Sequence, residues 1–389
     1  MMKRYLSLLL LLAAPLAGLA LEIRELASPA GPGAMGAALT RDERGVIYLT
    51  WLEPDGAGHA LKFSRLLAGA TRWTEPATIA TGAGWFVNWA DFPQLAVADG
   101  KMTAVWFVEN AGQGYRAYWS QSRDQGATWS SALPVSAESG ATEFTALQPL
   151  AGGRVLAVWL DARARAKGEE KQMLCARFLG EDGPDMIVDS MVCDCCQIAL
   201  VPTRDGGVLA AYRGRNPDEV RDIKLSRFNG RAWSRPEGLH RDGWKIAGCP
   251  VNGPRLVTDG SWHGVAWFTA ADDKPKVHAA LSVDGGETFE AAQLDLGKPE
   301  GRVDAVLLKD GTLLVSWLER AGEGKEGGIY LRGLTADNRV TEPEMLAPTK
   351  TTRASGFPRM VMRDDKHLVL AFTRDLEPSR LATLVVRVR

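Results

Sequence analysis

The chain has 389 residues, with 46 basic and 47 acidic residues and a formal net charge of −1. A hydrophobic share of 46% excludes a disordered protein, and the balanced charge gives no electrostatic reason to expect nucleic acid as a partner. Thirteen tryptophans and 41 glycines, with few long helical patterns, favour an all-β protein with many tight turns.

Residues 1–20 have the pattern of a signal peptide. Two basic residues, Lys3 and Arg4, precede an apolar run over residues 6–12, and small residues stand at positions 18–20. This run is too short for a transmembrane helix, and no later run is long enough, so we expect no membrane span after cleavage. We therefore expect a periplasmic or secreted protein whose cysteines meet oxidising conditions.

A short apolar strand that ends in an aromatic residue recurs along the whole chain. Its seven copies end at Trp51, Trp106, Trp159, Tyr212, Trp267, Trp317 and Phe372. The successive spacings, by subtraction, are 55, 53, 53, 55, 50 and 55 residues, and a period this regular indicates a repeat protein. Each copy belongs to a hairpin with a glycine turn of the Asp99-Gly100 kind.

Four antiparallel strands per repeat describe one blade of a β-propeller. We predict an all-β fold, a seven-bladed β-propeller that forms a single domain over residues 21–389. Seven third strands but only six fourth strands can be found after the aromatic-ended strands. The N-terminal strand, within residues 21–27, is expected to pair with residues 381–388 and so close the ring. Six blades with one irregular hairpin is the alternative.

Two turns carry a more specific motif. Residues 122–129 (Ser-Arg-Asp-Gln-Gly-Ala-Thr-Trp) and 282–289 (Ser-Val-Asp-Gly-Gly-Glu-Thr-Phe) both match S-x-D-x-G-x-T-[WF]. This pattern resembles the Asp-box (BNR repeat) of the sialidase-like propellers, whose sialidases have six blades. In that family the Asp-box lies away from the active site, so the resemblance implies a structural role, in which the carboxylate accepts hydrogen bonds from its own turn.

The chain also resembles an exported bacterial subgroup of sialidase-like proteins. The shared segments are residues 88–93 (Asn-Trp-Ala-Asp-Phe-Pro), 192–197 (Val-Cys-Asp-Cys-Cys-Gln) and 249–254 (Cys-Pro-Val-Asn-Gly-Pro). The sialidase resemblance implies an arginine triad and a tyrosine-glutamate pair. The sequence departs from it, because the F-R-I-P motif is missing and Gln94 stands where an arginine would be needed.

The loops that lead into the innermost strands surround one mouth of a propeller's channel, and we call them the mouth loops. Three cysteines fall in the mouth loop of the fourth blade and one in that of the fifth, so their thiols should be neighbours. These predicted metal ligands are Cys193, Cys195, Cys196 and Cys249. Thiolates suit a Cu(I) or Zn(II) ion, with Asp194 or His240 as an additional ligand. A disulfide from Cys249 to one of the three and a redox-active pair are the alternatives.

Polar residues gather in the same loops and in the loops between second and third strands, which surround the same mouth. Arginines stand at matching positions in three successive blades, where they would bind a carboxylate or another oxyanion unless each pairs with a local acid. The expected ligand-binding residues are Asn88, Trp89, Asp91, Arg213, Asn252, Arg255, Arg302 and Arg359. Glycoside hydrolysis needs a pair of carboxyl groups, and the candidate catalytic residues are Asp91, Glu143, Asp161 and Asp304.

The sequence therefore predicts an exported, monomeric propeller whose mouth binds a soft metal ion or an anionic ligand. Its partners would be a small molecule, a glycan or a metal ion. An exo-sialidase-type glycoside hydrolase or a lectin for anionic sugars is the alternative, and a pure interaction scaffold is the third. Whether the protein is an enzyme stays open at this level.

Overall fold

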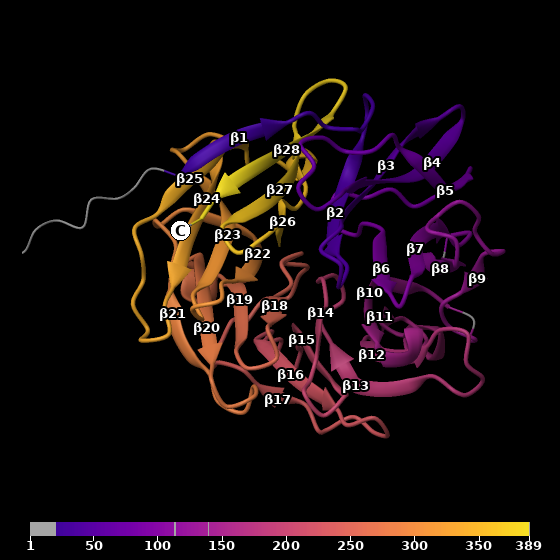
Figure 1. Cartoon of the computed structure of the whole chain (residues 1–389). Helices are drawn as coiled ribbons and strands as arrows, with labels where there is room; N and C mark the ends of the chain where they lie inside the picture. Colours follow the sequence, from indigo (N-terminus) through magenta and orange to yellow (C-terminus); the bar gives the residue numbers. More distant parts are fainter. Residues whose placement is uncertain (1–20, 113, 139, 389) are drawn as a thin grey trace, which may run out of the picture.

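The computed structural model describes residues 21–112, 114–138 and 140–388, and the expected signal peptide lies outside these residues. Within them, 28 strands form seven four-stranded antiparallel sheets in a ring (Figure 1). The predicted seven-bladed β-propeller is confirmed, and the six-bladed alternative is wrong. No helix in the described part of the chain is long and apolar enough to cross a membrane.

Each blade has four strands, counted outward from the channel. The innermost strands, which neighbour one another around the ring, are β2 (Met35–Arg41), β6 (Gln94–Ala98), β10 (Thr142–Leu150), β14 (Ala199–Pro202), β18 (Arg255–Thr258), β22 (Pro299–Leu307) and β26 (Arg359–Met362). The second strands are β3 (Ile47–Asp55), β7 (Lys101–Glu109), β11 (Arg154–Asp161), β15 (Val208–Arg213), β19 (His263–Thr269), β23 (Leu313–Arg320) and β27 (His367–Arg374).

The outer half of each blade completes the sheet. The third strands are β4 (Gly58–Leu66), β8 (Tyr115–Ser122), β12 (Gln172–Phe178), β16 (Ile223–Phe228), β20 (Lys276–Ser282), β24 (Glu326–Leu334) and β28 (Arg380–Arg387). The outermost strands are β5 (Ala77–Gly82), β9 (Leu133–Pro134), β13 (Met186–Val192), β17 (Glu237–Gly238), β21 (Glu290–Gln293), β25 (Glu344–Lys350) and β1 (Glu22–Leu26). Four short 3-10 turns are η1 (Ala151–Gly153), η2 (Arg165–Lys167), η3 (Ala271–Asp273) and η4 (Arg353–Ser355).

The ring closes as predicted, by a strand from the other end of the chain. Strand β1 lies beside β28 and pairs with it antiparallel, from Glu22 opposite Arg387 to Leu26 opposite Thr383 (Figure 1). The Thr383 hydroxyl donates to the Leu26 carbonyl at 2.7 Å. This pairing covers the edge that β28 would otherwise expose to other chains.

The aromatic residue of each second strand packs in the hydrophobic core between its own blade and the preceding one. Four of these residues, Trp51, Trp159, Trp267 and Trp317, are fully buried. A buried indole N–H needs an acceptor. In three blades the acceptor is a carboxylate two residues further on, at Glu53, Asp161 and Glu319. In the fifth blade that position is Thr269, and Asp242 from a preceding loop accepts the bond instead.

The two S-x-D-x-G-x-T turns have the same internal hydrogen bonds. Asp124 accepts from the Ser122 hydroxyl, and also from the amide and the hydroxyl of Thr128. Asp284 accepts the equivalent set from its own turn. Because they join third to fourth strands, both turns lie at the opposite end of the blades from the mouth loops, and their carboxylates hold the turns together.

Candidate functional site

The mouth loops bind one another. Gln197, in the loop of the fourth blade, donates to the Ala90 carbonyl of the second blade at 2.7 Å and accepts from the Gly253 amide of the fifth blade at 2.9 Å. A Cβ at Gly253 would collide with the Gln197 backbone, so only glycine allows this close approach. The loops that carry the cysteines are therefore in direct contact, as expected from their places in adjacent blades.

The same network continues around the mouth. Asn252 accepts from the Arg302 amide at 2.7 Å, and the Arg302 guanidinium donates to the Thr352 carbonyl at 2.5 Å and the Gly356 carbonyl at 3.1 Å. Its guanidinium carbon also lies 4.8 Å from the centre of the Trp89 ring. Side-chain contacts thus tie the mouth loops of the second, fifth, sixth and seventh blades to one another.

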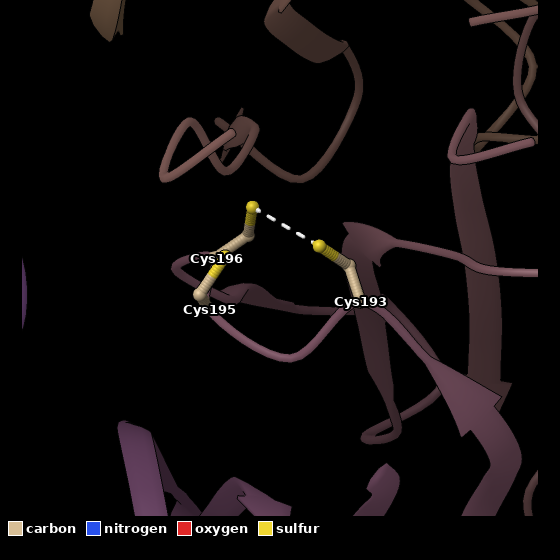
Figure 2. A group of neighbouring side chains, drawn as sticks. All are labelled: Cys193, Cys195 and Cys196. Atoms are coloured by element: carbon tan, nitrogen blue, oxygen red, sulfur yellow. Dashed lines mark hydrogen bonds between the residues drawn. The ribbon is translucent and has the colours of Figure 1, made fainter. Parts of the chain in front are cut away.

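Three of the four predicted metal ligands form a buried cluster. The sulfur atoms of Cys193, Cys195 and Cys196 all lie within 4.8 Å of one another, and the Sγ atoms of Cys193 and Cys196 point toward each other at 3.6 Å (Figure 2). Cys193 follows directly after β13, and two residues separate Cys196 from the start of β14. All five cysteines are free thiols in the structure, and among these Cys249 is exposed.

Hydrogen bonds favour the thiolate form of Cys193 within the cluster. Bonds from Cys195 and then Cys196 hold the pKa of the Cys193 thiol well below its ordinary value, although burial opposes them. Arg221 also donates to the Cys193 sulfur at 3.3 Å. Donation to Cys193 raises the pKa of Cys195, and burial raises that of Cys196.

Cys249 belongs to the rim of the cluster. A hydrogen bond from Cys195 lowers the pKa of the Cys249 thiol to about 7, so the two thiols are neighbours even though Cys249 reaches solvent. His240, the additional ligand considered from the sequence, does not join the cysteines and pairs with Asp242 instead.

Asp194 links the cysteine loop to a polar pocket. It accepts from Arg165 at 2.6 Å and from Arg215 at 3.4 Å. These three residues, with Gly168, Glu169 and Glu170, line a pocket of about 450 Å³. The pocket carries both signs of charge and lies directly beside the thiols, since Asp194 stands between Cys193 and Cys195 in the chain.

Asp91 is a buried acid with a strongly raised pKa. Burial raises the pKa of the Asp91 carboxyl to about 8, against hydrogen bonds from the Tyr115 hydroxyl at 2.6 Å and the Phe144 amide at 2.7 Å. Burial also raises the pKa of Glu143, which accepts from Gln172 at 3.1 Å. Two carboxyl groups that resist ionisation thus stand at the mouth in neighbouring blades, Asp91 in a loop and Glu143 at the start of β10.

The other two carboxylate candidates are saturated by hydrogen bonds. Asp161 accepts from the Trp159 indole and from the amide and guanidinium of Arg163. Asp304, which is fully buried, accepts from two backbone amides, those of Ala305 and Met360. Both carboxylates hold structure together in this conformation.

Two of the three predicted arginines converge, and the third does not. Arg255 contacts the Asp304 carboxylate at 2.7 Å and Arg359 contacts it at 3.8 Å, so two guanidiniums share one negative charge. Burial lowers the pKa of Arg359 to about 10. Arg302 lies apart, among backbone carbonyls, and burial lowers its pKa to about 10 as well.

The four remaining ligand-binding candidates also lie at the mouth. Arg213 is buried and donates to the carbonyls of Asn252, Arg221 and Phe268. The side chains of Asn88 and Trp89 are half-buried in the mouth loop of the second blade. Asn252 connects the fifth and sixth blades as described above. Arg213 and Asn252 therefore act as ties between loops in this structure.

Three residues at the mouth have a strained backbone. Phe144, Val251 and Arg302 have φ values of 48°, 49° and 55°, in the left-handed region that side-chain-bearing residues rarely adopt. Val251 is β-branched and lies two residues after Cys249. Such strain persists only where the surroundings impose it, and it is frequent at functional sites.

The sequence interpretation missed Tyr115. This residue begins the third strand of the second blade, outside the mouth loops, and stacks on Phe86 with ring centres 3.8 Å apart. Burial raises the pKa of the Tyr115 hydroxyl well above its ordinary value, and the nearby Asp91 and Glu143 add to the effect. Tyr115 follows a glycine-containing loop, and nothing in the neighbouring sequence indicates that its hydroxyl bonds to Asp91.

Comparisons with known proteins support the fold. A scan against models of protein families gives no match, and a search of curated proteins gives none. An ulvan lyase of polysaccharide lyase family PL25 has a similar structure, with a TM-score of 0.58 and 9% identity, over 92% of this chain and 95% of that one.

Two further solved structures are similar. A protein of unknown function from Dyadobacter fermentans has a TM-score of 0.53 and 15% identity, over 94% of this chain and 99% of that one. The GH93 α-L-arabinofuranosidase of Fusarium graminearum has a TM-score of 0.52 and 15% identity, over 93% and 96% of the two chains. At these identities the similarity shows a shared fold: the chain has the propeller architecture of these proteins.

Proposed function

We propose that this is an exported propeller that binds one soft metal ion, Cu(I) or Zn(II), at the mouth of its channel. Cys193, Cys195 and Cys196 are the ligands, and Cys249 completes the set from the next blade. The observation that carries the proposal is the mutual distance of three buried sulfur atoms, all within 4.8 Å of one another.

The spacing of the sulfurs suits a thiolate-bound ion. A Zn–S bond of about 2.3 Å in tetrahedral geometry places two ligand sulfurs about 3.8 Å apart. The Sγ atoms of Cys193 and Cys196 are 3.6 Å apart. A propeller blade needs apolar strands and glycine turns, and three cysteines in four residues have no part in building one.

The protonation of the cluster also favours a cation. Metal ligands must be deprotonated thiolates. The pKa values of Cys193 and Cys249 are lowered, which favours their thiolate forms, while Cys195 and Cys196 would release their protons when the ion binds. The Gly253 contact with Gln197 keeps the two loops close enough for the ion to be shared between blades.

An anionic ligand is a second candidate, favoured by one observation. Arg255 and Arg359 share a single carboxylate, Asp304, which leaves one positive charge uncompensated at the mouth. A bound carboxylate or sulfate would balance it. Titration with a carboxylated ligand tests this, and Arg255→Met should weaken binding by about 2 kcal/mol if the half-exposed Arg255 contacts the ligand.

A sialidase-type hydrolase acting on anionic sugars remains the alternative class, since Asp91 and Glu143 have the raised pKa values of general acids. The cavity beside Asp91 has a volume of about 10 Å³, room for about one water molecule. A sugar ring would therefore require the mouth loops to open. Turnover of an aryl sialoside that disappears in Asp91→Asn would establish this activity.

Elemental analysis and free-thiol titration test the metal proposal. The full chain is expressed with export to the periplasm and purified under reducing conditions, as wild type, Cys193→Ser and Cys249→Ser. Cys175→Ser is the matched control, because Cys175 lies on β12 and is also buried. Wild type and control should carry one ion per chain more than Cys193→Ser, and Cys249→Ser should carry less than wild type.

A portion of each preparation is kept free of reductant for the thiol titration. Metal-free protein in which that titration finds the four mouth cysteines in disulfides would refute the metal proposal and leave a stapled binding propeller. Sequencing the N-terminus of the same preparation tests export, with Leu21 expected as the first residue.

A further inference from the structure

A second group of metal-ligating side chains lies outside the cysteine cluster. His240 and Asp242 belong to the loop between β17 and β18, and His278 lies on β20 of the fifth blade. One ligand atom from each lies within 4.8 Å of the other two. The group includes no thiol, so it differs in chemistry from the site at the mouth.

The carboxylate is held with one oxygen toward the two imidazoles. The Trp267 indole donates to Oδ2 of Asp242 at 2.8 Å. The other oxygen, Oδ1, lies 2.9 Å from Nδ1 of His240 and 3.4 Å from Nδ1 of His278. Burial opposes ionisation of Asp242, but contacts with His278 and Trp267 outweigh it and lower its pKa.

His278 has a buried nitrogen without a satisfied bond. Its Nδ1 atom is inaccessible to solvent and has no hydrogen-bond partner among the described residues, because its contact with Asp242 lacks hydrogen-bond geometry. A buried polar atom of this kind requires a partner, and an ion is one. The His240 side chain is 40% exposed, which gives an ion a path from solvent and leaves room for water ligands.

We propose that His240, Asp242 and His278 bind a divalent transition-metal ion such as Zn(II). Bonds of about 2.0–2.1 Å to nitrogen and 2.0–2.2 Å to oxygen in tetrahedral geometry separate the two ligand atoms by about 3.3 Å. The two observed separations, 2.9 and 3.4 Å, lie on either side of this value. Two imidazoles and one carboxylate leave at least one coordination position open to water or to a ligand.

Calorimetric titration of the reduced full chain with zinc chloride tests the site. The variants are His240→Gln, at an exposed ring, and His278→Gln. His367→Gln is the matched control, because His367 also contacts an aspartate, Asp364, at 2.9 Å and belongs to no three-ligand group among the described residues. Circular dichroism and the unfolding midpoint in EDTA establish that each variant is folded.

We expect His240→Gln and His278→Gln to bind one equivalent of zinc fewer than wild type, or to bind it about 100-fold or more weakly. His367→Gln should equal wild type. The difference is independent of the cysteines, since the variants leave them intact. The absorption spectrum of the cobalt(II)-substituted protein identifies the ligands. The band that is lost in His240→Gln should be a weak ligand-field band, without the thiolate charge-transfer band that cysteine ligands produce.

Equal stoichiometry and affinity in wild type and His240→Gln would overturn the proposal, and that variant alone decides the case if His278→Gln fails to fold. A lost cobalt band with thiolate charge transfer would also overturn it, because the ion would then belong to the cysteines.

Discussion

Replacing Asp91 by asparagine should change how the stability of the protein depends on pH. The Asp91 carboxyl has a pKa of about 8 in the folded chain and an ordinary value of 3.8. Below pH 3.8 it is protonated in both states. Between 3.8 and about 8 the unfolded chain ionises it while the folded chain retains the proton, so folding must take up a proton and stability falls as pH rises. Above about 8 the penalty is constant.

The magnitude follows from that interval. At about 1.36 kcal/mol per pH unit, the interval from 3.8 to 7 destabilises the fold by roughly 4 kcal/mol at neutral pH. Asparagine cannot ionise, and its amide oxygen can still accept from the Tyr115 hydroxyl and the Phe144 amide. Asp91→Asn should therefore match wild type near pH 4 and exceed its free energy of unfolding by up to roughly 4 kcal/mol at pH 7.

Urea denaturation at a series of pH values between 4 and 8.5 measures this effect. Tyr115→Phe is the informative companion, because the Tyr115 hydrogen bond lowers the pKa of Asp91. Without that bond the pKa should rise further, and the decline in stability should continue to higher pH. If wild type and Asp91→Asn show the same slope of stability against pH, the Asp91 carboxyl does not retain its proton and the reasoning is refuted.

Three further outcomes are expected. Deleting residues 21–28 removes the five paired residues of β1 and should lower the free energy of unfolding by about 3–5 kcal/mol in thermal or urea denaturation; an unchanged midpoint would contradict closure. Gly253→Ala forces a methyl group against the Gln197 backbone. It should lower the free energy of unfolding by about 1–3 kcal/mol and weaken metal retention in dialysis. A structure of the variant without this clash would disprove the reasoning. Asp304→Asn leaves the largely buried Arg359 side chain without its counter-charge and should lower the unfolding free energy by about 3–5 kcal/mol. A change below about 1 kcal/mol would rule out this role.

The ring could be predicted because its signals are local and repeated. Aromatic-ended strands and glycine turns recur in every blade, and counting strands was enough to identify the closing role of β1. The contact between the two cysteine loops was also predictable, since consecutive blades are neighbours. The Asp-box family and the exported subgroup stay predictions on the motifs alone.

The direction of side chains at the mouth could not be predicted from matching positions. Arg302 was expected beside Arg255 and Arg359, but the pairing of β22 shifts its register between Gly301 and Asp304. This β-bulge, with φ of 55° at Arg302, turns the side chain toward the seventh blade. A bulge of this kind leaves no reliable sign in a single sequence.

The contacts of the remaining site residues depend on partners that are far away in the sequence. The hydrogen bonds that saturate Asp304 come partly from Met360, 56 residues away. Likewise, His278 meets His240 and Asp242 only because β20 packs beside the loop that precedes β18. No short segment of sequence contains either arrangement.

The pairing of β1 with β28 also bears on how the chain folds. Glu22 and Arg387 are partners across 365 positions of sequence, so this contact has nearly the largest separation the chain allows. Six blades are built from consecutive hairpins and can form as they are synthesised, whereas the seventh must wait until β28 is made. Until then β1 is an unpaired strand and the six-blade intermediate has two open edges. Refolding yield should therefore fall as protein concentration rises, because a second chain can supply the missing strand before the chain's own β1 returns.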